Sequence, residues 1–558
     1  MRRTVGRALA TLAMIGLAAG ACSSTQDAST DTTASATKSQ SGEITEYTVP
    51  AGSDVPQTGG SLVYGLEAET DGYSPIANRM APAGQIVANT LFDPLAAWGA
   101  DGKVYPYLAE SFESSELFTE WKITLRPDVR FHDGTPADGA AVQKFLLALR
   151  DAPLTGAAAA PIEDVTLVEG EPLAAVVHLD QPWVVFPAVL TNQGGMLMAP
   201  SQLDAGPAGS RQPVGTGPFR FVDWVPDAKL NVVRNDDYWQ DGLPYLDEIE
   251  FQPITDLQSR VNALETGSID VLHMAQQQLR PKLTQLAEEG KIQLWFGTGE
   301  EDEALILLNN STEPFNDVRL RKALAQATEH NEYFEATSTP PSRKADSFLS
   351  SDSPWYAADN GWPTYDLDAA KQLVNEWKAD HGGETPTFVF RTTPAPEQQS
   401  VGQLLERQWE AAGFDVTLET MEQTQHIATG LSGNYQANLW RQFSSPDPDG
   451  EFHWWISTAI AGEGSTGLNF ARLDDPQVDE ALRTGRTNLD PVERKKAYAD
   501  LQRRMSEIVP WVYLSHLQWM LAADLDVRDL TNTTLPDGTP AMPMVAGVHR
   551  MTQTWLES

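Results

Sequence analysis

Short strand-like segments alternate with helix-like segments along almost the whole chain from Gly59 onward. Residues 121–126 alternate large apolar and polar side chains, which is the period of two that a strand requires. Residues 401–419 combine a helical apolar stripe, a stop at Gly413 and a second run with period two. Strands that alternate with helices in this way predict an α/β fold with more than one sheet.

Capping residues predict where several of these helices begin. Asp256 is expected to cap a helix that Gly267 ends, and Asp490 is expected to cap a helix with Pro491 at its first position. The chain has 558 residues, which is more than a single hydrophobic core usually supports. We therefore expect several structural units rather than one.

The N-terminal residues have the layout of an export signal. Arginines precede an apolar run over residues 8–17, which is too short for a stable transmembrane helix. Small side chains at residues 18–21 then lead to Cys22, the only cysteine of the chain. A single cysteine excludes an intramolecular disulfide framework and a zinc site built from several thiolates.

This arrangement resembles a bacterial lipoprotein signal, in which the cysteine after the cleavage site is lipidated. Ala19 departs from the usual pattern, which has leucine there. The resemblance implies that residues 1–21 are removed as a signal peptide and that Cys22 carries the lipid. Residues 22–57 are low in large apolar side chains and predict a flexible tether. An ordinary secreted protein with its one cysteine at the cleavage site is the alternative.

The charge of the chain restricts its partners. Asp and Glu number 77 against 39 Lys and Arg, so the formal net charge is −38. A surface this negative repels phosphate backbones and anionic headgroups, so we expect no nucleic-acid partner and no membrane contact except through the N-terminal lipid.

The motifs of the common enzyme classes are missing from the sequence. No two of the nine histidines stand three or four residues apart, which excludes a zinc site of the HExxH type. There is no G-x-S-x-G motif. Residues 215–218 (GTGP) lack the lysine of a phosphate-binding loop, and Pro218 removes an amide donor. We therefore predict no catalytic residues, no metal and no cofactor.

Several segments, in order, resemble the extracytoplasmic solute-binding proteins of oligopeptide, dipeptide and nickel-type ABC importers. The similarity covers roughly residues 60–530, and the matching blocks share the family's order and spacing. The blocks are residues 108–112 (LAESF), 121–149 (WKITLRPDVRFHDGTPADGAAVQKFLLAL), 214–221 (VGTGPFRF), 235–239 (NDDYW), 263–270 (ALETGSID), 308–334, 365–377, 404–416 and 473–510.

The resemblance implies an α/β fold of the periplasmic-binding-protein type, with two hinged lobes, a ligand cleft between them and an extra inserted subdomain. The first lobe would comprise residues 58–87, 213–298 and 516–558. The inserted subdomain would occupy residues 88–212, and the second lobe residues 299–515.

Residues 440–455 (WRQFSSPDPDGEFHWW) form the most site-like stretch outside these motifs. Aromatic side chains combined with a few charged groups on a loop are typical of a ligand cleft. We predict ligand contacts from the aromatic and charged side chains of this stretch, namely Trp440, Arg441, Phe443, Asp447, Asp449, Trp454 and Trp455. A core position for Trp454 or Trp455 is the alternative.

The resemblance adds further candidates. In peptide-binding relatives an aspartate before an acid-proline pair holds the peptide ammonium group, and Ser444 occupies that position here. Dipeptide-binding relatives hold a carboxylate with an arginine close to the position of Arg391, whose alternative role is that of an exposed residue at a strand end. The loop after the first strand should border the cleft and supplies Asp71 and Tyr73, although the family's frequent Leu-Asp-Pro is replaced there.

We predict that the chain is a non-enzymatic receptor that delivers a peptide or a similar small organic solute to the permease and ATPase subunits of an ABC importer. It would act as a monomer on the outer face of the cytoplasmic membrane, or in the periplasm of a cell with two membranes. A nickel chelate, an opine, or a sugar-derived or aromatic solute remains open. Two rival functions are a receptor that serves a sensor or binds a glycan, and a secreted hydrolase with an acidic pair.

Overall fold

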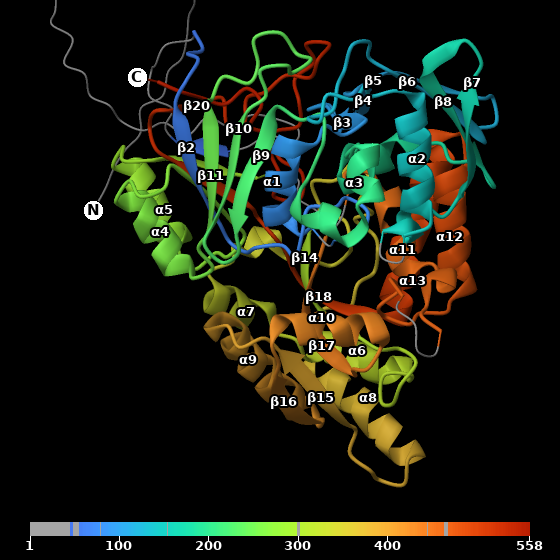
Figure 1. The fold of residues 1–558 in the computed structure, drawn as a ribbon. Helices are drawn as coiled ribbons and strands as arrows, with labels where there is room; N and C mark the ends of the chain where they lie inside the picture. Colours follow the sequence, from blue (N-terminus) through green and yellow to red (C-terminus); the bar gives the residue numbers. More distant parts are fainter. Residues whose placement is uncertain are drawn as a thin grey trace, which may run out of the picture.

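The computed structural model describes residues 45–47 and 55–557, apart from residues 79, 153–154, 298–301, 444 and 463–466. The predicted signal peptide, Cys22, most of the predicted tether and Ser444 lie outside the described residues. Among the described residues, no helix combines the length and the apolar character needed to cross a membrane. The described chain forms an upper and a lower body (Figure 1).

The upper body contains an eight-stranded sheet, and we call the part built on this sheet lobe I. The strand order is β1-β13-β19-β12-β2-β11-β10-β9. Strand β2 is parallel to β11 and β12, and the other pairs are antiparallel. The strands are β1 (Thr45–Tyr47), β2 (Ser61–Leu66), β9 (Phe219–Val225), β10 (Lys229–Arg234), β11 (Glu248–Pro253), β12 (Val271–Met274), β13 (Gln293–Phe296) and β19 (Met520–Ala523).

Helices cover both faces of this sheet. Helices α4 (Leu257–Glu265) and α5 (Arg280–Glu288) pack against one face, on the left in Figure 1. Helix α1 (Pro82–Leu91) packs on the opposite face. The Asp256 carboxylate accepts a hydrogen bond from the Ser259 backbone N–H at 2.8 Å, so it caps α4 as the sequence predicted. A short pair, β20 (Val527–Arg528) and β21 (Trp555–Leu556), completes lobe I.

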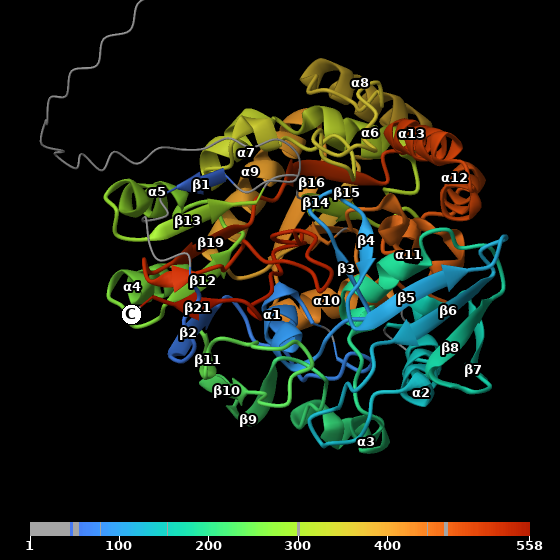
Figure 2. The same cartoon turned by 90° about the horizontal axis from the view of Figure 1, so that it is seen from above.

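A second sheet of four antiparallel strands lies beside lobe I, and we call the part around it the inserted subdomain (Figure 2). Its buried side chains join those of lobe I in one continuous apolar core. Its elements are β3 (Ala96–Trp98), β4 (Val104–Pro106), β5 (Ala109–Ser114), β6 (Glu120–Leu125), α2 (Gly139–Arg150), β7 (Ile162–Val168), β8 (Glu171–Leu179) and α3 (Pro200–Asp204), with sheet order β5-β6-β8-β7.

The lower body, lobe II, has its own sheet and its own core. The sheet order is β16-β15-β17-β14-β18, from β14 (Glu303–Leu308), β15 (Thr387–Thr392), β16 (Asp415–Thr420), β17 (Ala437–Gln442) and β18 (Trp511–His516). Its helices are α6 (Val318–Ala327), α7 (His330–Thr337), α8 (Leu367–Asp380), α9 (Pro396–Ala412), α10 (Gln423–Ser432), α11 (Phe452–Trp455), α12 (Pro476–Thr487) and α13 (Pro491–Ile508).

The chain passes between the lobes twice, once just before β14 and once between β18 and β19. These two crossings lie together: the Leu517 N–H donates to the Asp302 carbonyl at 2.7 Å, and the Trp519 indole N–H donates to the Asp302 carboxylate at 3.0 Å. The prediction of an α/β chain with more than one sheet is confirmed. Gly215 and Gly217 both pack against the carbonyl end of α1.

Candidate functional site

Arg441 joins the two lobes at the carboxyl end of β17. Its Nη2 donates to Glu67 Oε1 at 3.3 Å, and Glu67 is the first residue after β2 in lobe I. The guanidinium carbon lies 5.1 Å from the ring centre of Phe443 and 5.2 Å from that of Trp519. Arg441 is therefore held between aromatic rings of both lobes, where cation–π attraction adds to the ion pair.

Glu67 is ionised in this environment. Burial raises the pKa of its carboxyl group, but the nearby charges of Arg441 and Arg260 and the His273 ring outweigh burial and place the pKa below its usual value. The Glu67 side chain is only 6% exposed, whereas that of Arg441 is 31% exposed. The Arg441 side chain is thus open enough for a second acceptor, such as a ligand carboxylate, to reach it.

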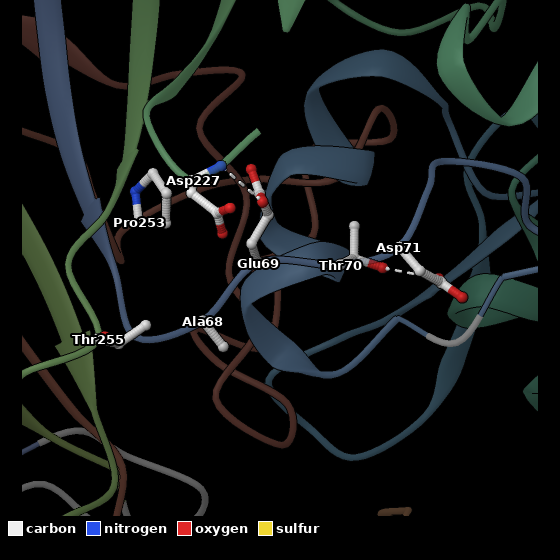
Figure 3. A pocket seen from close by; sticks show the side chains of 7 residues that line it. All are labelled: Ala68, Glu69, Thr70, Asp71, Asp227, Pro253 and Thr255. Carbon is white, nitrogen blue, oxygen red and sulfur yellow. Dashed lines mark hydrogen bonds between the residues drawn. The ribbon is translucent and has the colours of Figure 1, made fainter. Parts of the chain in front are cut away.

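The loop that follows Glu67 lines a hollow in lobe I with a volume of about 420 Å³ (Figure 3). It opens where the parallel strands β2 and β11 end. Its lining includes three carboxylates and no basic side chain, so it complements a cationic or hydrogen-bond-donating group. The lining residues are Ala68, Glu69, Thr70, Asp71, Asp227, Pro253 and Thr255.

Glu69 fixes the shape of this hollow. Its Oε1 accepts from the Trp224 indole N–H at 2.7 Å, and its Oε2 accepts from the Asp227 backbone N–H at 2.9 Å. These bonds tie the loop after β2 to the turn between β9 and β10. Both Glu69 oxygens are engaged, so Asp71 and Asp227 are the carboxylates better placed to receive a ligand group.

The predicted residues Asp71 and Tyr73 separate in the structure. Asp71 is exposed at the rim of the hollow and accepts from Asn78 Nδ2 at 3.1 Å. Tyr73 is buried in the lobe I core, with its ring centre 5.2 Å from that of Trp224 in an edge-on contact. Burial raises the pKa of the Tyr73 hydroxyl group. A role for Tyr73 in ligand binding stays a prediction.

Asp447 and Asp449 are buried and engaged with arginines of lobe II. Asp447 accepts from Arg494 Nη2 at 3.0 and 3.2 Å and caps the short turn that follows it. Asp449 accepts from Arg486 Nε at 2.8 Å. Their carboxylates are therefore committed to helices α12 and α13 in this conformation, and contact with a ligand would require these bonds to rearrange.

The aromatic candidates of the same stretch fall into two groups. Trp455 is fully buried in the lobe II core, with its ring centre 4.0 Å from that of Trp511. Trp440 and Trp454 are half-buried, and the ring of Phe470 lies between them, 5.4 and 5.3 Å away. Phe443 is half-buried as well, but it packs on the core of lobe I and the inserted subdomain.

Arg391 lies on β15, away from the junction made by Arg441. Its Nε donates to Glu419 Oε2 at 3.1 Å, and its Nη1 donates to the Asn434 carbonyl at 2.7 Å. All three residues belong to lobe II. Its predicted role in carboxylate binding is not tested by this arrangement, and Ser444 lies outside the described residues.

Sequence reasoning missed the partners that these residues meet. Glu67 and Trp519 flank Arg441, and Trp183 and Arg486 enclose Asp449. The position of Glu67 directly after the first predicted strand was an available signal, since the loop there was expected to border the cleft. Trp183 stands outside every matching block and Arg486 lies within the block of residues 473–510, but no local pattern marks either as a partner of Asp449.

His132 has a structural role at the motif turn. Its Nε2 donates to the Gly217 carbonyl at 3.0 Å, and its Nδ1 accepts from the Gly215 N–H at 3.4 Å. Burial lowers its pKa to about 4, so the ring is neutral at pH 7. Within the described part of the chain, no group of three or more His, Cys, Asp or Glu side chains is arranged to hold a metal ion.

The sequence of the chain is similar to those of known proteins. Residues 103–463 match the family model described as "Bacterial extracellular solute-binding proteins, family 5 Middle". A glutathione-binding protein GsiB of Pectobacterium atrosepticum is 26% identical over 441 residues, which cover 77% of this chain and 84% of that protein.

Solved structures share the fold. AgaA of A. tumefaciens R10, in complex with agropinic acid, aligns with a TM-score of 0.77 at 23% identity and covers 89% of this chain and 99% of its own. DppA of Helicobacter pylori, in complex with the peptide STSA, aligns with a TM-score of 0.78 at 19% identity and covers 90% of this chain and 99% of its own. Coverage this high extends over lobe I, the inserted subdomain and lobe II.

Proposed function

Since the chain belongs to the bacterial extracellular solute-binding proteins of family 5, we propose that it captures a peptide, or a similar small organic solute with a carboxylate, between lobe I and lobe II. The family assigns it to the non-enzymatic, extracytoplasmic component of an ABC importer. The interpretation as a secreted hydrolase is therefore set aside. Closure of the lobes over the solute would be the signal that the permease reads.

Arg441 is the observation that carries the proposal for a carboxylate. Its guanidinium group lies between the lobes, contacts Glu67 at 3.3 Å and keeps exposed surface. A carboxylate that binds there would contact a residue of lobe II while it lies against lobe I. Glutathione, agropinic acid and a peptide, the compounds named for the relatives above, all carry such a group.

The hollow beside Glu67 supports a solute with a positive group as well. Asp71 and Asp227 line it, and it lies on the same loop as the residue that holds Arg441. A zwitterion such as a peptide would meet a cation at one end and carboxylates at the other. The half-buried ring of Phe443, 5.1 Å from the Arg441 guanidinium carbon, would provide an apolar wall, and Trp440 and Trp454 remain candidates for apolar contacts from lobe II.

The second part of the proposal concerns anchorage. Cys22 would carry a lipid and hold the receptor at the outer face of the cytoplasmic membrane. The signal-like N-terminus supports this. The predicted tether of residues 22–57 is corrected at residues 45–47, which form β1 and pair with β13 in the lobe I sheet, so the tether would run from Cys22 to β1. A soluble periplasmic receptor with the same fold is the alternative.

A thermal-shift panel tests the ligand class. The panel contains pools of di- to octapeptides, glutathione, an opine, nickel–histidine and neutral sugars. We expect stabilisation by peptides, because a ligand that binds only the folded state raises the melting temperature. A shift with the opine or the nickel chelate alone would replace peptides by those solutes. A shift with sugars alone would refute the carboxylate proposal. Genes for a permease and an ATPase next to the gene of this protein would argue against a sensor or a glycan as its partner.

A further inference from the structure

A buried polar junction, separate from the Arg441–Glu67 pair, connects the inserted subdomain to lobe II. Trp183 follows β8 of the inserted subdomain, whereas Asp449 and Arg486 belong to lobe II. All three residues are at most 6% exposed. The junction lies where α11 and α12 face the inserted subdomain, on the right in Figure 1.

Three types of contact cross this junction. The Trp183 indole N–H donates to Asp449 Oδ2 at 2.6 Å, and the Val184 backbone N–H donates to the Arg486 carbonyl at 3.2 Å. The Arg486 guanidinium carbon lies 4.3 Å from the Trp183 ring centre. On its other side the same guanidinium lies 3.5 Å from the ring centre of Phe452, so it is stacked between a ring of each part.

The charges at the junction are paired within lobe II. Arg486 Nε and Nη2 donate to Asp449 at 2.8 and 3.3 Å, and both residues stay on lobe II if the lobes part. Separation would therefore not break the ion pair. It would remove the indole hydrogen bond to an ionised acceptor, which is among the stronger hydrogen bonds in proteins, and would expose the covered guanidinium face.

Lobe I and the inserted subdomain share one core, whereas lobe II has a separate core. A hinge motion between these bodies would have to break the Trp183 contacts. We propose that Trp183 is a positioning residue for solute capture: its indole N–H latches the inserted subdomain to Asp449 and keeps the lobes together before any solute binds. This inference rests on the hinge motion of the proposed function, but not on the identity of the solute.

The latch bears on the candidate site because of where Asp449 lies. Asp449 follows Phe443 and precedes Trp454 on the stretch that would wall the solute. A bond from Trp183 therefore orients this stretch from the opposite body. Loss of the bond would reduce the fraction of receptors whose site is assembled, and the apparent affinity for a solute would fall by the same factor.

The distance between the lobes in the absence of solute tests the latch. Cys22→Ser removes the only cysteine, and Leu167→Cys with Tyr365→Cys then place spin labels on exposed sites of the inserted subdomain and lobe II. Trp183→Phe removes the N–H but keeps a ring over Arg486. Trp555→Phe is the matched control, because the buried Trp555 donates its indole N–H to Asp529 Oδ2 at 2.9 Å entirely within lobe I.

We expect one dominant short distance in the parent chain and in the Trp555→Phe variant. Trp183→Phe should raise the ratio of a longer to the shorter distance about tenfold, which is the effect expected from loss of a hydrogen bond to a charged group. If circular dichroism shows that Trp183→Phe does not fold, Asp449→Asn is measured instead. It should raise the same ratio, because the Trp183 indole N–H then has only a neutral amide in place of a carboxylate as its partner.

Two results would overturn the latch: a variant distribution that superimposes on that of Trp555→Phe, or a parent chain that already shows mainly the longer distance. Neither result depends on a bound solute. If no compound of the thermal-shift panel binds, the proposed solute class fails while the distance measurement still decides the latch.

Discussion

At the scale of single residues, Arg441 and Arg391 are rival candidates for the same role. Both guanidinium groups pair with a glutamate, but Arg441 reaches across to lobe I and Arg391 stays within lobe II. We expect Arg441→Gln to weaken the best carboxylate ligand of the panel by 10- to 100-fold, because a charged hydrogen bond contributes about 1.5–3 kcal/mol.

The matched control is Arg391→Gln, which should leave affinity within about twofold and lower only the stability of lobe II. Calorimetric titration of both variants measures the two effects. A larger loss of affinity at Arg391 than at Arg441 would assign the ligand carboxylate to Arg391, as the resemblance to dipeptide-binding proteins implied.

Asp93 predicts a pH dependence of stability. Its buried carboxylate accepts from Trp239, Tyr238 and Thr216, and burial outweighs these bonds and raises its pKa to about 6. Between pH 4 and pH 6 the folded chain therefore keeps a proton that the unfolded chain has released. The free energy of unfolding should fall as pH rises through this window, by about 3 kcal/mol in total.

Urea unfolding of the parent chain and of Asp93→Asn, followed from pH 4 to pH 7, isolates this contribution. The difference between the two chains should change across the window and stay constant above pH 7. Parallel pH profiles would show that Asp93 keeps an ordinary pKa.

At the scale of elements, the loop of residues 214–218 is shaped by its contact with α1. A Cβ atom on Gly215 would clash with the Leu91 carbonyl oxygen, so the loop could not keep its place. We expect Gly215→Ala to lower the free energy of unfolding by about 3 kcal/mol through overpacking.

Gly242→Ala serves as the control for this substitution. Gly242 has a φ of +79°, and a Cβ atom added there would have no heavy atom of another residue within 4 Å. Alanine at this position therefore costs about 1 kcal/mol of backbone strain alone. Chemical denaturation compares the two variants. Equal losses would mean that the contact with α1 is not tight.

Elements that depend on local signals were predictable from the sequence. Asp490 accepts from the Val492 N–H at 2.8 Å and caps α13, and Gly413 ends α9 with a φ of +103°, as their sequence context indicated. Helix α13 ends at Ile508, and Val509 leaves it with a φ of +44°.

The candidate site was less predictable, because its partners are distant in sequence. The sequence predicted Asp449 to be a ligand contact on a loop. In the structure its carboxylate accepts a hydrogen bond from the indole N–H of Trp183, which lies 266 residues earlier in the chain. The sequence around Asp449 does not indicate a contact with Trp183, and the sequence around Trp183 does not indicate a contact with Asp449. The arginines that hold Asp447 and Asp449 likewise come from helices whose own patterns indicate only a buried face. The hydrophobic periodicity of a helix predicts which of its residues are buried, but it does not predict which charged residue each of them contacts.

At the scale of the whole molecule, attachment at Cys22 would place the acidic receptor at the membrane surface. Its net charge of −38 gives no electrostatic attraction to anionic headgroups, so we expect retention to depend on the lipid alone. Cys22→Ser should release the protein from the membrane fraction into the soluble fraction, as immunoblots of fractionated cells would show. A variant that stays bound after a high-salt wash would contradict lipidation.

The largest apolar cores lie in different lobes, which predicts how the molecule unfolds. One spans lobe I and the inserted subdomain, with a smaller core under α4 and α5 on the other face of the lobe I sheet, and another fills lobe II. The lobes are joined by two chain crossings and by polar contacts such as the Arg441–Glu67 pair, so the cores should unfold as separable units. Trp455→Ala removes a fully buried ring from lobe II and should cost that unit about 3–5 kcal/mol.

Scanning calorimetry should then show a low-temperature transition from lobe II while the transition of the other core stays in place. Leu62→Ala, at a fully buried position of the lobe I core, should instead lower the transition temperature of lobe I and the inserted subdomain and leave that of lobe II in place. A ligand that contacts both lobes should bring the two transitions together, because unfolding of either lobe would then release it. A single transition that shifts as a whole in both variants would mean that the contacts between the lobes, the Trp183 latch among them, couple the cores more strongly than their separation implies.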